Sequence, residues 1–208
     1  MTESSFYPRT RADFALIAGA VSHALQVDAR LPEWTFTAES GKIDICQFGV
    51  CIEGPFGRIL QHLVDEHGDV SVSLMVLSPE PEYYRQNYGS FPAFTIPAES
   101  VEEGYWDAVV YEPNGDPTGA VGYTANVVGI AGSSGMWAVW GERRWDIAMI
   151  LSQTRYGGWL TGDVAFVDSE TALSEFTEPD FKTPLSVAER ETFLSNVRAR
   201  GTFGEMSG

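Results

Sequence analysis

Apolar residues in three stretches of the chain recur at spacings of three and four, which is the pattern of an amphipathic helix. This pattern predicts one helix over residues 10–25 and another over residues 54–68, where a proline suits the first turn and a glycine the end. A third helix is expected to start at residues 183–184 near the C-terminus. Ser186 and Glu189 offer this helix an alternative start, because a serine followed by a glutamate three residues later can form a capping box.

Alternating or continuous apolar runs fill the middle of the chain and are typical of β-strands. Strands are expected at residues 34–38, 42–52, 70–77, 105–111, 119–130 and 159–167, with a hairpin at 136–151. This arrangement predicts a single α+β domain with a mostly antiparallel, twisted sheet of about seven to nine strands, two helices in the N-terminal half and one C-terminal helix. Residues 1–8 are expected to form a loose arm, residues 202–208 a loose tail, and residues 168–183 an acidic, irregular segment.

The hairpin stretch 136–151, MWAVWGERRWDIAMIL, holds three of the six tryptophans of the chain. Two apolar runs flank the polar link 141–144, and a symmetric turn there sets Trp140 opposite Trp145. Because side chains alternate between faces, one face is wholly apolar and must be buried; it carries Met136, Ala138, Trp140, Trp145, Ile147, Met149 and Leu151. The other face is mixed; it carries Trp137, Val139, Arg144, Asp146, Ala148 and Ile150. We therefore expect Trp137 to be only partly covered.

Trp137, Arg143 and Arg144 are the predicted contact residues of this hairpin. Tryptophan and arginine are over-represented among the residues that dominate protein interfaces. The competing interpretation is that all three tryptophans are core or half-core residues of the sheet.

Charge adds a second clue, because the chain has 29 acidic and 13 basic residues and a net charge of −16. No lysine or arginine lies between Arg85 and Arg143, and the predicted binding acids fall in this interval: Glu99, Glu102, Glu103, Asp107, Glu112 and Asp116. Such an acidic field repels nucleic acid and anionic membranes, and it attracts a basic protein partner. The simpler alternative is that acidity serves solubility alone.

Motifs for catalysis or metal binding are weak. His62 and His67 are five residues apart and diverge on a helix, so neither a metal site nor a cofactor is expected. The glycine-rich stretch 129–135, GIAGSSG, lacks the lysine of a phosphate-binding loop and leads into a strand. A nucleophile at Ser133 or Ser134 would need one of only three histidines.

Two other functions stay open at this point. The carboxylates of residues 99–116, with Tyr105, Trp106 and Tyr111 among them, would suit a hydrolase, because paired carboxylates carry out glycoside hydrolysis. A structural or phage-associated assembly subunit is the other alternative.

The expected compartment is the cytoplasm. The opening residues MTESSFYPRTR lack the charged and then apolar pattern of a secretory leader, and the apolar run 14–21 is too short to cross a bilayer. Cys46 and Cys51 are five residues apart, which on a strand points them to opposite faces, so reduced and buried thiols are expected.

The hairpin also carries a resemblance. Residues 134–150, SGMWAVWGERRWDIAMI, resemble the W-apolar-W-G-[ED]-R hairpins of small uncharacterised bacterial proteins, some of which are immunity proteins that neutralise polymorphic toxins. The resemblance covers seventeen of the 208 residues. It implies an acidic, single-domain cytoplasmic protein that occludes a basic toxin domain without any catalytic residue. The sequence as a whole favours a non-enzymatic acidic binding protein, immunity- or inhibitor-like.

Overall fold

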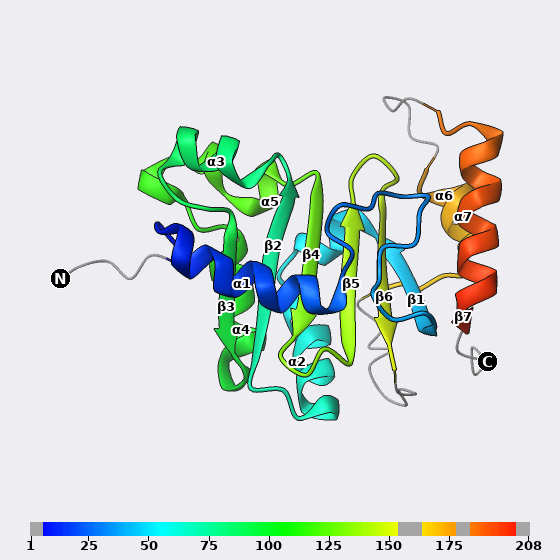
Figure 1. Ribbon diagram of the computed structural model, residues 1–208, viewed down its shortest axis with the longest axis horizontal. Helices are drawn as coiled ribbons and strands as arrows, with labels where there is room; N and C mark the ends of the chain where they lie inside the picture. The colour runs from blue at the N-terminus through cyan, green and yellow to red at the C-terminus, as the bar shows by residue number, and fades with distance from the viewer. Residues whose placement is uncertain (1–5, 154–163, 178–183, 203–208) are drawn as a thin grey trace.

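A computed structural model describes residues 6–153, 164–177 and 184–202 of the chain. Within these ranges seven strands form one sheet in the order β3-β2-β4-β5-β6-β1-β7, with helices on both faces (Figure 1). The strands are β1 (Gly41–Gln47), β2 (Ser71–Ser78), β3 (Ala93–Pro97), β4 (Val127–Gly132), β5 (Trp137–Glu142), β6 (Ile147–Ser152) and β7 (Gly201–Thr202). All neighbouring strands are antiparallel except β1 and β7, which run parallel. The predicted α+β class with a mostly antiparallel sheet is therefore confirmed.

The helices of the described ranges are more numerous than predicted. They are α1 (Arg11–Ala24), α2 (Phe56–His67), α3 (Pro81–Tyr88), α4 (Val101–Val109), α5 (Val121–Thr124), α6 (Ser169–Glu175) and α7 (Val187–Arg200), with 3₁₀ turns η1 (Phe48–Ile52), η2 (Ala98–Ser100), η3 (Pro113–Gly115) and η4 (Pro117–Gly119). No described helix has the length and apolar character that a bilayer crossing demands.

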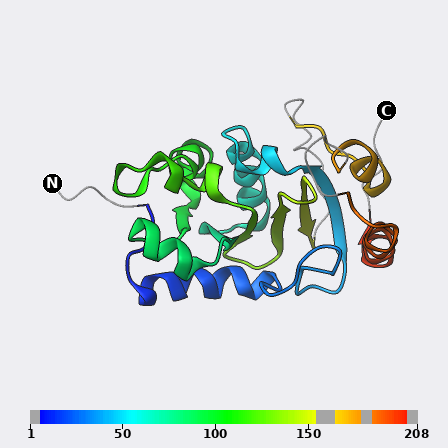
Figure 2. The same ribbon diagram turned by 90° about the horizontal axis from the view of Figure 1, so that it is seen from above.

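The helices cover the sheet from both sides. Helix α1 crosses one face over β2 and β4, and α2 and α4 lie on the opposite face (Figure 2). Two apolar clusters fill the spaces between the sheet and these layers. Helices α6 and α7 lie beside β1 and β7 at one edge of the sheet (Figure 1). This layered arrangement leaves no strand of the sheet centre open to solvent, because every residue of β4, β5 and β6 is buried.

The three predicted helices form where the apolar stripes place them. Thr10 caps α1 by accepting a hydrogen bond from the backbone N–H of Asp13. Helix α2 ends at Gly68, whose φ of 63° is left-handed and suits glycine. Helix α7 uses the alternative start, because Ser186 and Glu189 form the complete capping box.

The tryptophan hairpin has the predicted faces but a different register. Trp140 pairs with Met149, so the turn covers residues 143–146, and the expected pairing of Trp140 with Trp145 is wrong. Asp146 closes this turn with a φ of 54°, a left-handed conformation that aspartate tolerates. The displacement is an even number of residues, so each side chain of the strands keeps its predicted face. Trp145 lies in the turn and is still buried, where its ring packs against Phe193 of α7 at 5.4 Å.

The prediction that Trp137 is only partly covered is wrong, because only 1% of its surface is exposed. Both faces of the sheet are covered, so the mixed face of the hairpin is a second core face and not a solvent face. The indole Nε1 of Trp137 donates to Oδ2 of Asp69 at 2.7 Å. Asp69, itself 6% exposed, also accepts from the hydroxyl of Ser133 and the backbone N–H of Ser134. This carboxylate fastens the β4–β5 connection to the end of α2.

Several strand predictions are wrong. Residues 105–111 belong mainly to α4, residues 119–130 reach a strand only at Val127, and residues 34–38 make a single bridge through Phe36. The predicted strand 42–52 ends at Gln47 and continues as the η1 turn. Backbone alternation over short apolar runs does not distinguish a strand from a buried helix, and that ambiguity produced these errors.

Other predictions fall partly outside the described residues. Residues 159–163 of one predicted strand lie there, while Val167 forms a single bridge to Ile45. The segment predicted as irregular contains α6, capped by the side chain of Asp168, and its residues 178–183 are outside the described ranges. Of the predicted arm, residues 1–5 are outside, and Tyr7 is buried in the core.

We expect Asp69→Ala to lower the free energy of unfolding by about 3 kcal/mol, because it leaves the buried Trp137 indole and two further donors without their charged acceptor. Urea unfolding followed by tryptophan fluorescence measures this loss. Asp28→Ala, at an exposed aspartate, is the matched control and should change the stability by less than about 0.5 kcal/mol. Equal effects of the two substitutions would contradict the role given to Asp69.

Candidate functional site

The outward side of α4 gathers acidic residues around an exposed tryptophan. Glu102, Glu103, Trp106 and Asp107 lie on the side of the helix opposite its buried residues, and Glu99 precedes the helix in the η2 turn. This surface, the α4 acidic face, consists of Glu99, Glu102, Glu103, Trp106 and Asp107. All five residues are exposed, and Trp106 shows 45% of its surface to solvent.

The inward side of α4 explains why the segment is helical. Val101, Tyr105, Ala108 and Val109 are buried on that side. The hydroxyl of Tyr105 donates to the backbone carbonyl oxygen of Cys51, and burial raises the pKa of this phenol well above its ordinary value. A Cβ on Gly57 of α2 would lie 2.8 Å from the carbonyl oxygen of Glu102, so the two helices approach as closely as glycine allows. The α4 acidic face is therefore mounted on a firmly packed helix.

Little of the negative charge on this surface is neutralised. Arg58 of α2 forms an ion pair with Glu102 at 3.2 Å, and both side chains are about half exposed. Such an exposed pair contributes at most about 1 kcal/mol. Glu99, Glu103 and Asp107 make no ion pair within the described ranges.

The remaining predicted acids lie elsewhere. Glu112 and Asp116 are exposed on the loop that follows α4. The carboxylate of Asp116 accepts hydrogen bonds from the backbone N–H and the hydroxyl of Thr118, so it caps η4. Asn114 of the same loop donates to the backbone carbonyl of Tyr88 at 2.7 Å, which ties the loop to α3.

The predicted hairpin contacts are also separated from one another. Arg143 donates through Nε to the carbonyl of Ala125 at 2.9 Å, and its guanidinium lies 4.8 Å above the ring of Phe48. Arg144 reaches the other way and pairs with Glu189 of α7 at 2.7 Å. With Trp137 buried, the predicted contact set does not form one surface, and only its α4 residues lie together.

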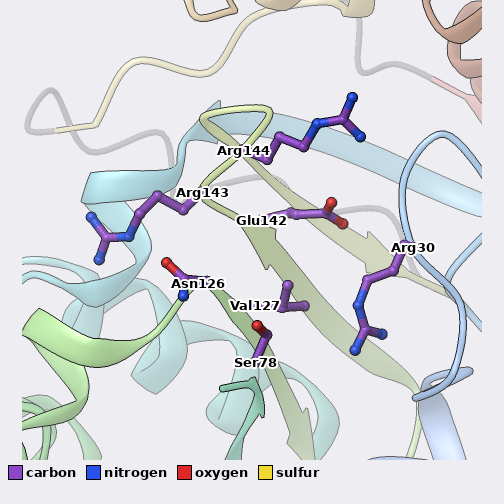
Figure 3. A pocket seen from close by; sticks show the side chains of 7 residues that line it. All are labelled: Arg30, Ser78, Asn126, Val127, Glu142, Arg143 and Arg144. Atoms are coloured by element: carbon purple, nitrogen blue, oxygen red, sulfur yellow. The ribbon is translucent and has the colours of Figure 1, made fainter. Parts of the chain in front are cut away.

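A pocket of about 460 Å³ lies beside this turn (Figure 3). Its lining residues are Arg30, Ser78, Asn126, Val127, Glu142, Arg143 and Arg144. Figure 3 shows the guanidinium groups of Arg143 and Arg144 pointing to opposite sides, away from the centre of the pocket. The carboxylate of Glu142 lies between Arg144 and Arg30 in the same view.

Glu142 is a buried carboxylate that the sequence analysis did not single out. It is 5% exposed, and its Oε2 accepts from the backbone N–H of Leu31 at 3.0 Å and from Nε1 of Trp140 at 3.3 Å. Burial raises the pKa of Glu142, and these hydrogen bonds and the charges of Arg30 and Arg144 offset only part of that rise. The sequence did carry a signal for this burial, because Glu142 is an even number of residues from Trp140 and therefore falls on the apolar face of the hairpin.

The weaker catalytic candidates are not assembled into a site. His62 is exposed on α2, and Nε2 of His67 lies 3.4 Å from the hydroxyl of Ser152. Ser133 bonds to Asp69 and to the backbone N–H of Val70 and not to a histidine. The residues with described positions contain no group of three or more His, Cys, Asp or Glu that could hold a metal ion. Cys46 and Cys51 are free and buried, as predicted.

Comparisons with protein-family models, with curated proteins and with solved structures give no match to this chain. The resemblance of residues 134–150 to immunity-protein hairpins thus stays a prediction.

The buried Glu142 makes a prediction about pH. Below its ordinary pKa of 4.5, the carboxyl is protonated in both the folded and the unfolded chain. Between 4.5 and its raised pKa the folded chain binds more protons, so the free energy of unfolding falls as the pH rises through this window. Glu142→Gln removes the titration and keeps an acceptor for Leu31 and Trp140. The stability of the variant relative to the wild type should therefore increase with pH.

Urea unfolding at a series of pH values from acid to neutral measures this difference. Glu33→Gln removes one carboxyl at an exposed position and is the matched control. A relative stability that stays flat for Glu142→Gln, or that rises as steeply for Glu33→Gln, would contradict the assignment.

Proposed function

We propose that this protein is a non-enzymatic acidic binding protein, immunity- or inhibitor-like, that occludes a basic protein partner with its α4 acidic face. The observation that carries the proposal is that Trp106, Glu102, Glu103 and Asp107 are all exposed on the outward side of a well-packed helix, with the exposed Glu99 just before it. The proposed partner is a protein domain with a lysine- or arginine-rich surface, such as a toxin domain.

Charge and shape have separate roles in this proposal. The carboxylates and the net charge of −16 steer a basic surface toward the helix during diffusional encounter. Trp106 then offers a large apolar contact and a ring face for an arginine or lysine of the partner. Because Tyr105 and its neighbours hold α4 in place, little conformational freedom is lost on binding.

The same surface is less suited to the hydrolase alternative. Its carboxylates project from one side of a single helix, whereas glycoside hydrolysis needs two carboxyl groups that flank the scissile bond. In our proposal the protein acts in the cytoplasm, where the buried thiols of Cys46 and Cys51 remain reduced. Nucleic acid and anionic membranes are not partners, because the acidic field repels them.

The charge part of the proposal is tested by replacing Glu102, Glu103 and Asp107 together with alanine. We expect the association rate with a basic partner to fall by about tenfold at low salt, with little change in the dissociation rate. The difference should shrink as added salt screens the charges. The partner is first captured on immobilised wild-type protein at low salt and is then purified for stopped-flow or biolayer measurements.

A control variant with the same change in net charge separates local from global effects. It replaces three exposed acids outside the α4 acidic face with alanine: Glu33, Glu175 and Glu191. Binding that responds equally to both triple variants, or that ignores both the variants and salt, would refute the charge part of the proposal.

The contact part is tested with Trp106→Ala. We expect a loss of affinity of about 2 kcal/mol, roughly thirtyfold, that appears mainly in the dissociation rate and persists at high salt. Tyr83→Ala, which removes another exposed aromatic ring from α3, is the matched control and should leave binding unchanged. Unaltered binding by the Trp106 variant, with unaltered circular dichroism, would rule out this helix as the contact surface.

A further inference from the structure

The pocket of Figure 3 holds two opposite charges that do not pair with each other. Arg30 and Glu142 both line it, yet no ion pair within 4.0 Å joins them. Each is instead held by its own neighbours. The Arg30 guanidinium donates hydrogen bonds to the backbone carbonyls of Val27, Ala29 and Leu77. It also lies 5.7 Å from the centre of the Trp140 ring.

Both charged groups keep unused hydrogen-bonding capacity. A guanidinium has five N–H donors, so two of those on Arg30 are left after the three backbone bonds. Glu142 uses only Oε2 in its two bonds, and its Oε1 has no protein partner within the described ranges.

Neutral polar groups beside these charges are unused as well. The hydroxyl of Ser78 and the side-chain amide of Asn126 make no hydrogen bond to any residue whose position is described. Val127 adds an apolar patch to the lining. A pocket of about 460 Å³ on which several polar side chains converge falls within the usual size range of a small-molecule site.

We propose that this pocket binds a zwitterion of the size of a free amino acid. Its carboxylate is placed at the remaining donors of Arg30 and its ammonium group at Oε1 of Glu142, while Ser78 and Asn126 take further polar atoms. Arg30 is held by its hydrogen bonds to backbone carbonyls, and Glu142 by the hydrogen bonds that it accepts from Leu31 and Trp140. Both charges are therefore fixed before the ligand arrives, and few side chains become ordered on binding.

The distribution of charge favours a zwitterion over a simple anion. The guanidinium groups of Arg143 and Arg144 turn away from the pocket, toward Phe48 and Glu189 respectively (Figure 3). Of the charged side chains that line the pocket, Arg30 and Glu142 are the two whose charged groups face its interior, so a lone anion would lie close to the carboxylate of Glu142. The site shares no residue with the α4 acidic face, so this proposal does not depend on the proposed function and is tested separately.

The test uses the full chain labelled with ¹⁵N and follows the indole N–H of Trp140, which donates to Glu142. Each proteinogenic L-amino acid is titrated separately, as are acetate and ethylammonium. We expect at least one amino acid to give a saturable shift with a Kd of about 1 mM or tighter. Acetate and ethylammonium should bind at least about tenfold more weakly, because each reaches only one of the two charges.

Two variants assign the shift to the pocket. Glu142→Gln should weaken the amino acid at least about tenfold, and Asn126→Ala, an exposed residue whose substitution spares the core, should weaken it by a smaller factor. Gln86→Ala on α3 removes an exposed amide elsewhere and should leave the Kd unchanged. The proposal is overturned if no amino acid saturates, if acetate alone binds as tightly, or if both pocket variants bind like the wild type.

Discussion

Burial of the central strands on both faces is the constraint on which the rest of this structure depends. Every residue of β4, β5 and β6 is buried, with α1 on one side and α2 and α4 on the other. A sheet covered in this way cannot present side chains to a partner from its faces. The outer sides of helices and the ends of strands are left for contacts with other molecules, and the proposed α4 acidic face and Arg30–Glu142 pocket lie there.

The extent to which sequence predicts this fold is visible in the tryptophan hairpin. Alternation correctly assigned its side chains to two faces, because that assignment depends only on parity. It did not reveal that residues 143–146 form the turn, in which Asp146 has a left-handed conformation. The exposure of Trp137 was predicted wrongly because a local pattern carries no information about which helices return to cover the second face.

The residues of the proposed binding surface were predicted in the same partial way. The acids of residues 99–107 were recognised from their charge, but the strand predicted over residues 105–111 placed Trp106 and Asp107 on opposite faces. In the helix both residues are exposed on the outward side, while Tyr105 is buried on the inward side. Glu112 and Asp116 belong to a loop that no charge pattern could separate from the helix. Glu142 was overlooked although its parity with Trp140 placed it on the apolar face, and its partner Leu31, 111 residues earlier in the chain, was not predictable from local pattern.

The edge of the sheet at β1 is closed by residues from much later in the chain. Val167 donates its backbone N–H to the carbonyl of Ile45 at 2.9 Å, and β7 pairs with the start of β1 at Gly41 and Lys42. A strand with open N–H and C=O groups readily pairs with another chain. During synthesis β1 can pair with β6 well before residues 167 and 201 emerge, so an incomplete chain exposes an unprotected edge. Val167 and β7 therefore cover an edge that could otherwise pair with another chain, in addition to the contribution of the C-terminal segment to the core.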